Sequence, residues 1–284
     1  MHRNKMIVGM LISLLGITVL APVALAATET FHETYNVKPE TRLTVSNKNG
    51  GITIRAWENE TVDVVAEKKT NLGGKLEDVE IAVTVGERMT IETVHLVKNP
   101  RVSVSYTISV PSSMIIEQVQ SSNGAMTLQG ANGDVIAKTS NGAIKIVEHT
   151  GNVSVETSNG GIELQQINGS VKAETSNGAI KITGVTGITG VKTSNGSIHA
   201  EIMEIAEESL ELKTSNGSIK IFLASDLNAD VEMNTSNGKI SIQDIEIVTT
   251  EISKTSFEGR IGDGGKKLEV KTSNGTIEVY GLRK

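Results

Sequence analysis

Among the residues that could carry acid–base chemistry, the aspartates are scattered along the chain. A β-helix enzyme that cleaves polysaccharides needs clustered carboxylates, or an Arg or Lys base beside a bound cation, within one groove. The aspartates recur at no fixed spacing, and they are Asp63, Asp78, Asp134, Asp226, Asp230, Asp244 and Asp263. We therefore predict that the protein is not an enzyme and has no catalytic residues.

Residues that could bind a metal or a cofactor are also sparse. The chain has no Cys, which excludes disulfides, thiolate metal sites, cysteine nucleophiles and a Cys-anchored lipoprotein. Gly262-Asp263-Gly264-Gly265 resembles a calcium-binding turn, but it occurs once, whereas such sites work as stacked arrays. The histidines beyond residue 26 lack metal-ligand spacing, and we expect them to be solvated surface residues: His32, His95, His149 and His199. The sequence thus predicts no metal site, no cofactor-binding site and no cofactor.

Composition narrows the possible partners. Aromatic residues make up only 2% of the chain, with three Phe, three Tyr and one Trp. This argues against a core built on large rings and against a sugar-binding cleft built on stacked rings. The formal net charge is −6 and no segment is strongly basic, so a nucleic-acid partner is not expected.

Repetition is the strongest signal in the sequence. From Gly124 to Gly196 a glycine stands every nine residues, and the full unit of two similar halves has 18 residues. Beyond Gly196 the spacing grows to 21 residues, as far as Gly259, and the last step, to Gly275, is 16. The motif Thr-Ser-Asn-Gly, which has a variant at Ser121, begins at Thr139, Thr157, Thr175, Thr193, Thr214, Thr235 and Thr272.

Apolar residues alternate with polar ones after each glycine, as in Ile144/Ile146 and Ile162/Leu164. Alternation with period two, β-branched residues and glycine punctuation together indicate short strands with one buried face. Residues 27–120 lack the nine-residue spacing but keep the alternation. There we expect strands at Arg42–Val45, Ile52–Trp57, Thr61–Ala66, Val79–Val85, Met89–Val94 and Val102–Val110.

Two topologies could use such strands, a meander of hairpins closed by Asn-Gly turns or a solenoid whose equivalent strands stack in parallel. The nearly constant length of the whole unit favours the solenoid. We predict an all-β fold, a parallel β-solenoid of the β-helix type, with 18–21-residue coils and a β-rich N-terminal cap. Glycine would supply the positive φ of each corner. The corner asparagines would form a hydrogen-bonded column from Asn123 to Asn237, resumed at a terminal Asn274, and Asn49-Gly50-Gly51 resembles an early copy of the repeat.

The N-terminal residues have the pattern that is typical of an export signal. A positive segment, an apolar run from Met6 to Leu20 and an Ala24-Leu25-Ala26 cleavage site predict a signal peptide at residues 1–26. An uncleaved membrane anchor is the alternative, since Met6 to Ala27 could just span a bilayer. We therefore divide the chain into the signal peptide, a cap region at residues 27–120 and a solenoid at residues 121–284. No membrane insertion is expected of the mature chain.

Particular motifs resemble a known family. Ile52-Thr-Ile-Arg-Ala-Trp57 followed by Thr61-Val-Asp-Val-Val-Ala66 resembles its N-terminal signature, and Val104–Pro111 resembles its strand ending in Val-Pro. The Ser-Asn-Gly repeats then follow. The family is the exported "putative adhesin" group of β-strand-repeat proteins, a domain of unknown function. The resemblance covers nearly all of the mature chain; it implies a parallel β-solenoid at the cell surface and suggests adhesion, and it brings no catalytic residues.

Three classes of function follow from these observations. The first is an exported, non-catalytic surface or envelope protein that serves as an adhesion or binding scaffold. The second is an envelope accessory or sensory protein that binds another exported protein, and the third is a carbohydrate-active β-helix enzyme. The expected partner is a surface glycan, a cell-wall component or an exported protein. The expected location is extracellular, at the cell surface or in the periplasm.

Overall fold

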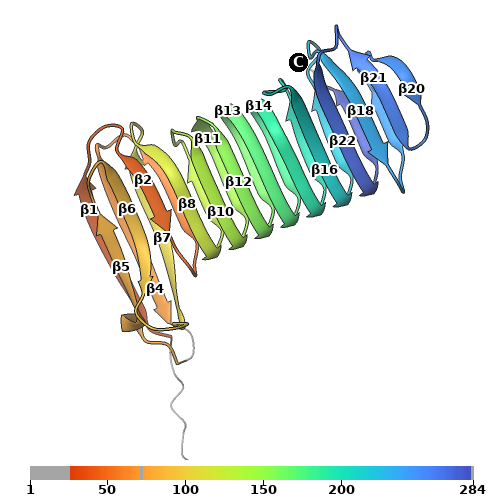
Figure 1. Cartoon of the computed structure of the whole chain (residues 1–284). Helices are drawn as coiled ribbons and strands as arrows, with labels where there is room; N and C mark the ends of the chain where they lie inside the picture. Colours follow the sequence, from red (N-terminus) through yellow and green to blue (C-terminus); the bar gives the residue numbers. More distant parts are fainter. Residues whose placement is uncertain (1–25, 71–72, 283–284) are drawn as a thin grey trace, which may run out of the picture.

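The chain folds into one long stack of β-strands (Figure 1). The computed structural model describes residues 26–70 and 73–282, so the predicted signal peptide lies, except for its last residue, outside the described residues. The described chain forms 23 strands in one hydrogen-bonded sheet and a short 3-10 helix, η1 (Leu76–Asp78). Most neighbouring strands are parallel, so the expected all-β, mainly parallel architecture is confirmed. No helix among the described residues is long and apolar enough to cross a membrane.

The strands form two layers, one on each side of the core. We call these layers face A and face B. From the N-terminal to the C-terminal end of the stack, face A holds β5 (Val79–Thr84), β6 (Arg88–His95), β2 (Arg42–Ser46), β8 (Ile115–Asn123), β10 (Val135–Asn141), β12 (Val153–Asn159), the second halves of β13 (Ile162–Asn177) and β14 (Ile180–Asn195), β16 (Ser209–Asn216), β22 (Lys266–Asn274), β18 (Ala229–Thr235), β21 (Ser256–Ile261) and β20 (Val248–Ile252). Face B holds β1 (Thr28–Asn36), β4 (Thr61–Thr70), β7 (Val102–Pro111), β3 (Ile52–Trp57), β9 (Met126–Gln129), β11 (Ile144–Thr150), the first halves of β13 and β14, β15 (Ile198–Ile202), β17 (Ile219–Leu223), β23 (Ile277–Gly281) and β19 (Ile240–Gln243).

Equivalent positions of the repeat pair with one another along each face. In face A, Val135 pairs with Val153, and in face B, Ile144 pairs with Ile162. The two partners of such a pair are 18 residues apart in sequence. Because neighbouring strands lie about 4.8 Å apart, like side chains form columns along the stack. The parallel pairing rules out the hairpin meander for these repeats.

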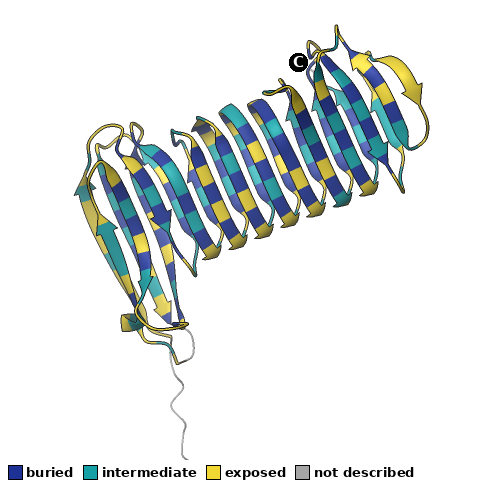
Figure 2. Cartoon of the chain, viewed as in Figure 1, coloured by how far each residue is buried: buried dark blue, intermediate teal, exposed yellow. Residues whose placement is uncertain are grey.

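The core is a narrow apolar interior between the two faces. The inward apolar side chains of β12 and β13, such as Val155 and Leu164, are at most 2% exposed, whereas the residues between them face outward. Figure 2 shows the same alternation on strand after strand. A shift of register by one residue would turn every apolar side chain outward, so burial itself holds the register.

The stacking order departs from the sequence order at the C-terminal end. The sequence order predicts the corners of Asn216, Asn237 and Asn274 in that succession, but β22 and β23 insert between β16–β17 and β18–β19. Asn274 therefore lies between the other two, and the prediction that it is a terminal corner is wrong. The physical reason lies in residues 244–261, which leave the repeat. There β21 and β20 add antiparallel strands beyond β18 and occupy the end of face A.

The N-terminal end shows a similar exchange. The β2–β3 segment lies between β6–β7 and β8–β9, although it precedes all four strands in sequence. Asn123 Nδ2 donates to Asn49 Oδ1 at 2.7 Å, so the early copy of the repeat at Asn49-Gly50 does join the corner column. Beyond it, β1, β4 and β5 pair antiparallel and form the end of the stack.

A buried polar network joins these N-terminal strands. The Thr93 hydroxyl donates to Asn47 Oδ1 at 2.9 Å and lies 2.7 Å from the Tyr106 hydroxyl, while Asn47 Nδ2 donates to the Val104 carbonyl at 2.7 Å. Burial raises the pKa of Tyr106 to about 12, so this hydroxyl keeps its proton. Each of these buried polar side chains has a hydrogen-bond partner within the network. The network therefore holds the end of β2 against β6 and β7.

The strands expected in residues 27–120 are all present, each within a few residues of the expected bounds. Two further strands, β1 and β8, were not expected. β1 (Thr28–Asn36) is an almost wholly exposed edge strand without apolar alternation, which explains why the sequence pattern does not indicate it.

Candidate functional site

The threonines of the Thr-Ser-Asn-Gly motif point into the stack. Each is between 2% and 7% exposed, and its hydroxyl donates to the carbonyl of a corner glycine in the neighbouring coil, at 2.9–3.2 Å. Thr175, for example, donates to Gly160 at 3.0 Å. The sequence does contain the signal for this direction, because Thr175 continues the alternation of Val171 and Ala173. The threonines are therefore structural.

The asparagines form a continuous ladder along the outside of the corner. Except at Asn49, which only accepts, each Nδ2 donates to the Oδ1 of the neighbouring asparagine, at 2.7–2.9 Å, and every bond points the same way. In stacking order the members are Asn49, Asn123, Asn141, Asn159, Asn177, Asn195, Asn216, Asn274 and Asn237. The predicted column is confirmed, with the corrected order at its end.

The corner glycines are required for a different reason from the expected one. Gly142 and Gly160 are not in the left-handed region, so the expected positive φ is wrong at these corners, whereas Gly133 and Gly151 at the opposite corner do have it, with φ of 108° and 124°. A Cβ at Gly142 would instead lie 2.1 Å from the carbonyl oxygen of Gly124 in the adjacent coil. Such a contact is far shorter than atoms tolerate. The close approach of successive corners is what excludes a side chain.

The serines of the motif are the members that the stack does not use. Ser158, Ser176 and Ser194 are exposed, and their hydroxyls make no hydrogen bond to any part of the chain that the structure describes. They form a column on face A beside the asparagine ladder. Because the threonines and asparagines already hold the corners together, these hydroxyls are free to bind water or a ligand.

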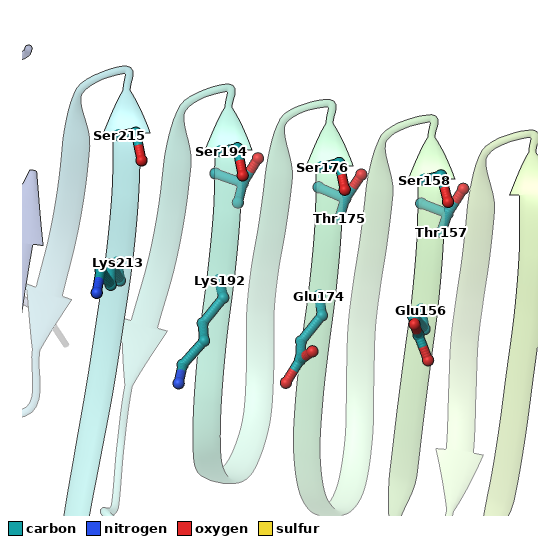
Figure 3. A pocket seen from close by; sticks show the side chains of 11 residues that line it. Glu156, Thr157, Ser158, Glu174, Thr175, Ser176, Lys192, Ser194, Lys213 and Ser215 are labelled. Carbon is teal, nitrogen blue, oxygen red and sulfur yellow. The ribbon is translucent and has the colours of Figure 1, made fainter.

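A shallow depression of about 350 Å³ follows this serine column across β12, β13, β14 and β16. Figure 3 shows the serines in one row near the corner and the charged side chains in a second row farther along the same strands. The residues that line the depression from these two rows are Ser158, Ser176, Ser194, Ser215, Glu156, Glu174, Lys192 and Lys213. The depression is thus a polar surface that presents hydroxyl, carboxylate and ammonium groups in register.

Most charges of this second row are neutralised by neighbours. Glu156 pairs with Lys138 at 2.8 Å, and Lys192 pairs with Glu211 at 2.7 Å. These hydrogen bonds raise the pKa of both lysines, which therefore stay charged at neutral pH. Lys213 differs, because it makes no ion pair within residues 26–70 and 73–282.

Face B carries an aromatic cluster that the sequence pattern does not predict. The rings of Phe222 and Tyr280 stack at 5.3 Å, His199 lies 5.2 Å from Phe222, and Lys220 Nζ is 4.6 Å from the Tyr280 centroid. Composition counts rings but not their positions, and these rings meet because β23 inserts beside β17. Because the two rings stack on each other, one face of each ring is already occupied.

One histidine contradicts the expectation of solvated surface residues. His149 is 1% exposed and its Nε2–H donates to the Gly133 carbonyl at 2.6 Å, while Nδ1 is buried without a hydrogen-bond partner. His149 occupies an inward position of β11, in register with Ile167 of the next coil. Burial lowers its pKa, so it is neutral at physiological pH. Its role is in the core.

The aspartates stay dispersed in the fold, and several have local contacts. Asp134 Oδ1 accepts from the Asn152 backbone N–H at 2.8 Å, Asp230 pairs with Arg260 at 3.2 Å, and Asp63 lies 2.8 Å from His32 Nε2. Among the described residues, no three His, Asp or Glu side chains are grouped closely enough to hold a metal ion.

Parallel columns of like residues around a narrow apolar core define an all-β repeat protein of the solenoid-like class. The chain belongs to the Toastrack DUF4097 family, whose sequence profile matches residues 41–280. The family resemblance of the sequence motifs is thereby confirmed. No curated protein matches the chain in sequence.

Three solved structures were found to be similar to the chain at low sequence identity. A "putative adhesin" from Bacteroides fragilis is 14% identical, with a TM-score of 0.52 over 88% of this chain and 97% of that one. A "putative cell adhesion protein" from Clostridium sporogenes is 11% identical, with a TM-score of 0.26 over 89% of this chain and 100% of that one. A "putative lipid binding protein" from Parabacteroides distasonis is 9% identical, with a TM-score of 0.36 over 88% and 96%. Only the first is close enough in structure to support the fold.

Proposed function

We propose that the protein is an exported, non-catalytic surface or envelope scaffold that binds its partner along face A. In this proposal the repeats form a solenoid of 18–21-residue coils, residues 27–120 cap it, and the signal peptide of residues 1–26 directs export. The observation that carries the proposal is the serine column, whose hydroxyls lie in a depression and are not used by the stack. The description of one structural relative as an adhesin agrees with it.

Repetition gives such a surface its binding strength. An elongated partner that lies along the stack meets the same hydroxyl about every 4.8 Å. Each contact is weak, but contacts made by one partner add up, because the later ones form without a further loss of translational freedom. The asparagine ladder and the threonine bonds hold the corners still, so little flexibility is lost on binding.

The test is a binding screen of the purified mature chain against glycans and cell-wall fractions. A variant with Ser176→Phe and Ser194→Phe fills the depression and should lose the partner. The matched control places the same side chains on face B, with Thr127→Phe and Thr183→Phe, and should bind as the wild type does. Equal binding by both variants would remove face A as the site, and release of sugar from the substrate would indicate the enzyme class instead.

A second candidate function rests on the exposed edge strand β20. Val248 and Ile252 are 71% and 70% exposed, the largest exposed fractions among the large apolar side chains of the described chain. Edge strands recruit a strand from a partner through backbone hydrogen bonds. A pull-down from envelope extract that recovers one exported protein, and loses it on Val248→Lys with Ile252→Lys, would favour the accessory or sensory function.

A further inference from the structure

We propose that Lys192, Lys213 and Lys271 form a binding row for a linear polyanion, which lies along the stack over the neighbouring serines. The ligand class is a polymer that carries carboxylate or phosphate groups at regular intervals. This inference rests on the proposed function and names the ligand class for the same site.

The three lysines stand directly beside one another on adjacent parallel strands. Lys192 pairs in register with Lys213, and Lys213 with Lys271. Neighbouring strands are about 4.8 Å apart, and like charges in facing positions destabilise a sheet. Face B has the arrangement that favours stability, where Lys145 meets Glu163 at 3.0 Å. Ion pairs offset the repulsion at the two ends of the row, where Lys192 meets Glu211 and Lys271 meets Glu269, but none offsets it at Lys213 among the described residues.

The carboxylates that pair with the lysine row lie on the side of the row that is away from the corner. Glu211 and Glu269, which pair with Lys192 and Lys271, precede the lysine positions of their strands by two residues and so lie away from the corner. On the corner side come Ser194, Ser215 and Ser273, followed by the uncharged asparagine ladder. An anion over the serines would meet ammonium groups on one side and hydroxyl donors below it, with no carboxylate between.

Lys213 is the centre of this row. It is exposed and lines the depression, and no carboxylate pairs with it in the described part of the chain. An anionic group bound between Lys213 and the Ser194 and Ser215 hydroxyls would neutralise the charge of the Lys213 ammonium group. The insertion of β22 adds Lys271 on the far side, so that the row runs beyond the depression.

The other end of the depression limits where a polyanion can lie. Glu174 and Glu156 precede Lys192 in the same row, in register with each other, and each is already paired with a lysine, Glu174 with Lys172 at 3.0 Å and Glu156 with Lys138 at 2.8 Å. This end of the row therefore offers an anion carboxylates and no free ammonium group. A polyanion is therefore directed from Lys192 toward the C-terminal end of the stack. A single exposed ion pair contributes little, so a polymer that contacts all three lysines should bind while its monomer does not.

The experiment measures binding of the mature chain to polygalacturonate, inorganic polyphosphate, neutral dextran and anionic phospholipid vesicles, with galacturonate and orthophosphate as monomers. We expect at least one polyanion to bind and neither monomer to do so, and the two polymers separate carboxylate from phosphate recognition. Lys213→Gln should weaken binding about two- to fivefold, and replacement of all three lysines by Gln should abolish it. Lys181→Gln is the matched control, since Lys181 is an exposed lysine of face B that makes no ion pair in the described residues.

A second variant guards against structural damage. Glu174→Gln removes a carboxylate at the end of the row and releases Lys172 from its ion pair, so it should tighten binding, a result that loss of structure cannot produce. Equal effects of Lys181→Gln and Lys213→Gln would overturn the inference, because net charge alone would then explain binding. Binding to dextran or to cell walls but to neither polyanion would overturn it and leave the proposed scaffold function standing. Binding only to anionic phospholipid vesicles would assign the row to a membrane surface and contradict it.

Discussion

At the scale of single residues, the direction of a side chain decides its role more than its type does. Thr175 and Ser176 carry the same functional group in neighbouring positions. The first is buried and bonds to Gly160, while the second faces solvent and bonds to nothing in the described chain. The same principle separates His149, which faces the core, from the exposed His32. Residue type alone predicts neither difference.

The buried His149 makes stability depend on pH. Burial lowers its pKa below the ordinary 6.5, although the Gly133 carbonyl partly offsets this effect. Between these two pKa values the unfolded chain binds a proton that the folded chain does not, so folding stability falls as the pH falls. Above the unfolded pKa this contribution is fully present.

We therefore expect the wild type to lose more stability between about pH 8 and about pH 5 than the variant His149→Gln, which cannot titrate. Gln can still donate a hydrogen bond to the Gly133 carbonyl, so the variant keeps that contact. The measurement is the free energy of unfolding from urea denaturation at several pH values. Parallel pH profiles for the two proteins would show that His149 is not the group responsible.

At the scale of elements, each corner column acts as a connector between coils. Asn177 both donates to Asn159 and accepts from Asn195, at 2.8 Å in each case. Asn274 likewise has a neighbour on each side, whereas Asn237 bonds only to Asn274 within the ladder. Removing an internal amide orphans two neighbours, and removing the last one orphans a single neighbour.

Asn177→Ala and Asn274→Ala should therefore each lower the free energy of unfolding by about 1 kcal/mol, and Asn237→Ala by less. Chemical denaturation of the three variants measures the difference, with Ser176→Ala as the control that removes no hydrogen bond of the described structure. A coil order that followed the sequence would reverse the ranking of Asn237 and Asn274. That reversal would contradict the inserted position of β22.

At the scale of the whole molecule, sequence predicts the repeated part well and the ends poorly. Strict alternation and a constant unit length suffice for the strands between residues 121 and 223, since each coil packs on the one before it. Leu268 and Val270 alternate as every other coil does, so nothing in their own pattern tells where β22 inserts. The place is decided by residues 244–261, whose antiparallel strands occupy the end of face A.

The candidate site, too, can be predicted only in part from the sequence. The depression lies where the stack follows the sequence, and its serine column could be anticipated from the repeat. The lysine row could not, because Lys213 and Lys271 become neighbours only through the insertion of β22. The stacked rings of Phe222 and Tyr280 depend on the insertion of β23 in the same way.

The inserted order also predicts how the molecule responds to truncation. Repeat proteins are held together by interfaces between nearest neighbours. Removal of residues 264–284 deletes β22 and β23, which lie between β16–β17 and β18–β19, and so removes two interfaces at once. Residues 229–261 would then lose the surface on which they pack.

We expect residues 229–261 to lose hydrogen-exchange protection in the truncated chain, while residues 135–202 keep theirs. Deletion of β1, which pairs only with β4, is the matched control and should leave residues 229–261 protected. In a stack that followed the sequence order, the truncation would remove only the last coil, and residues 229–261 would stay protected.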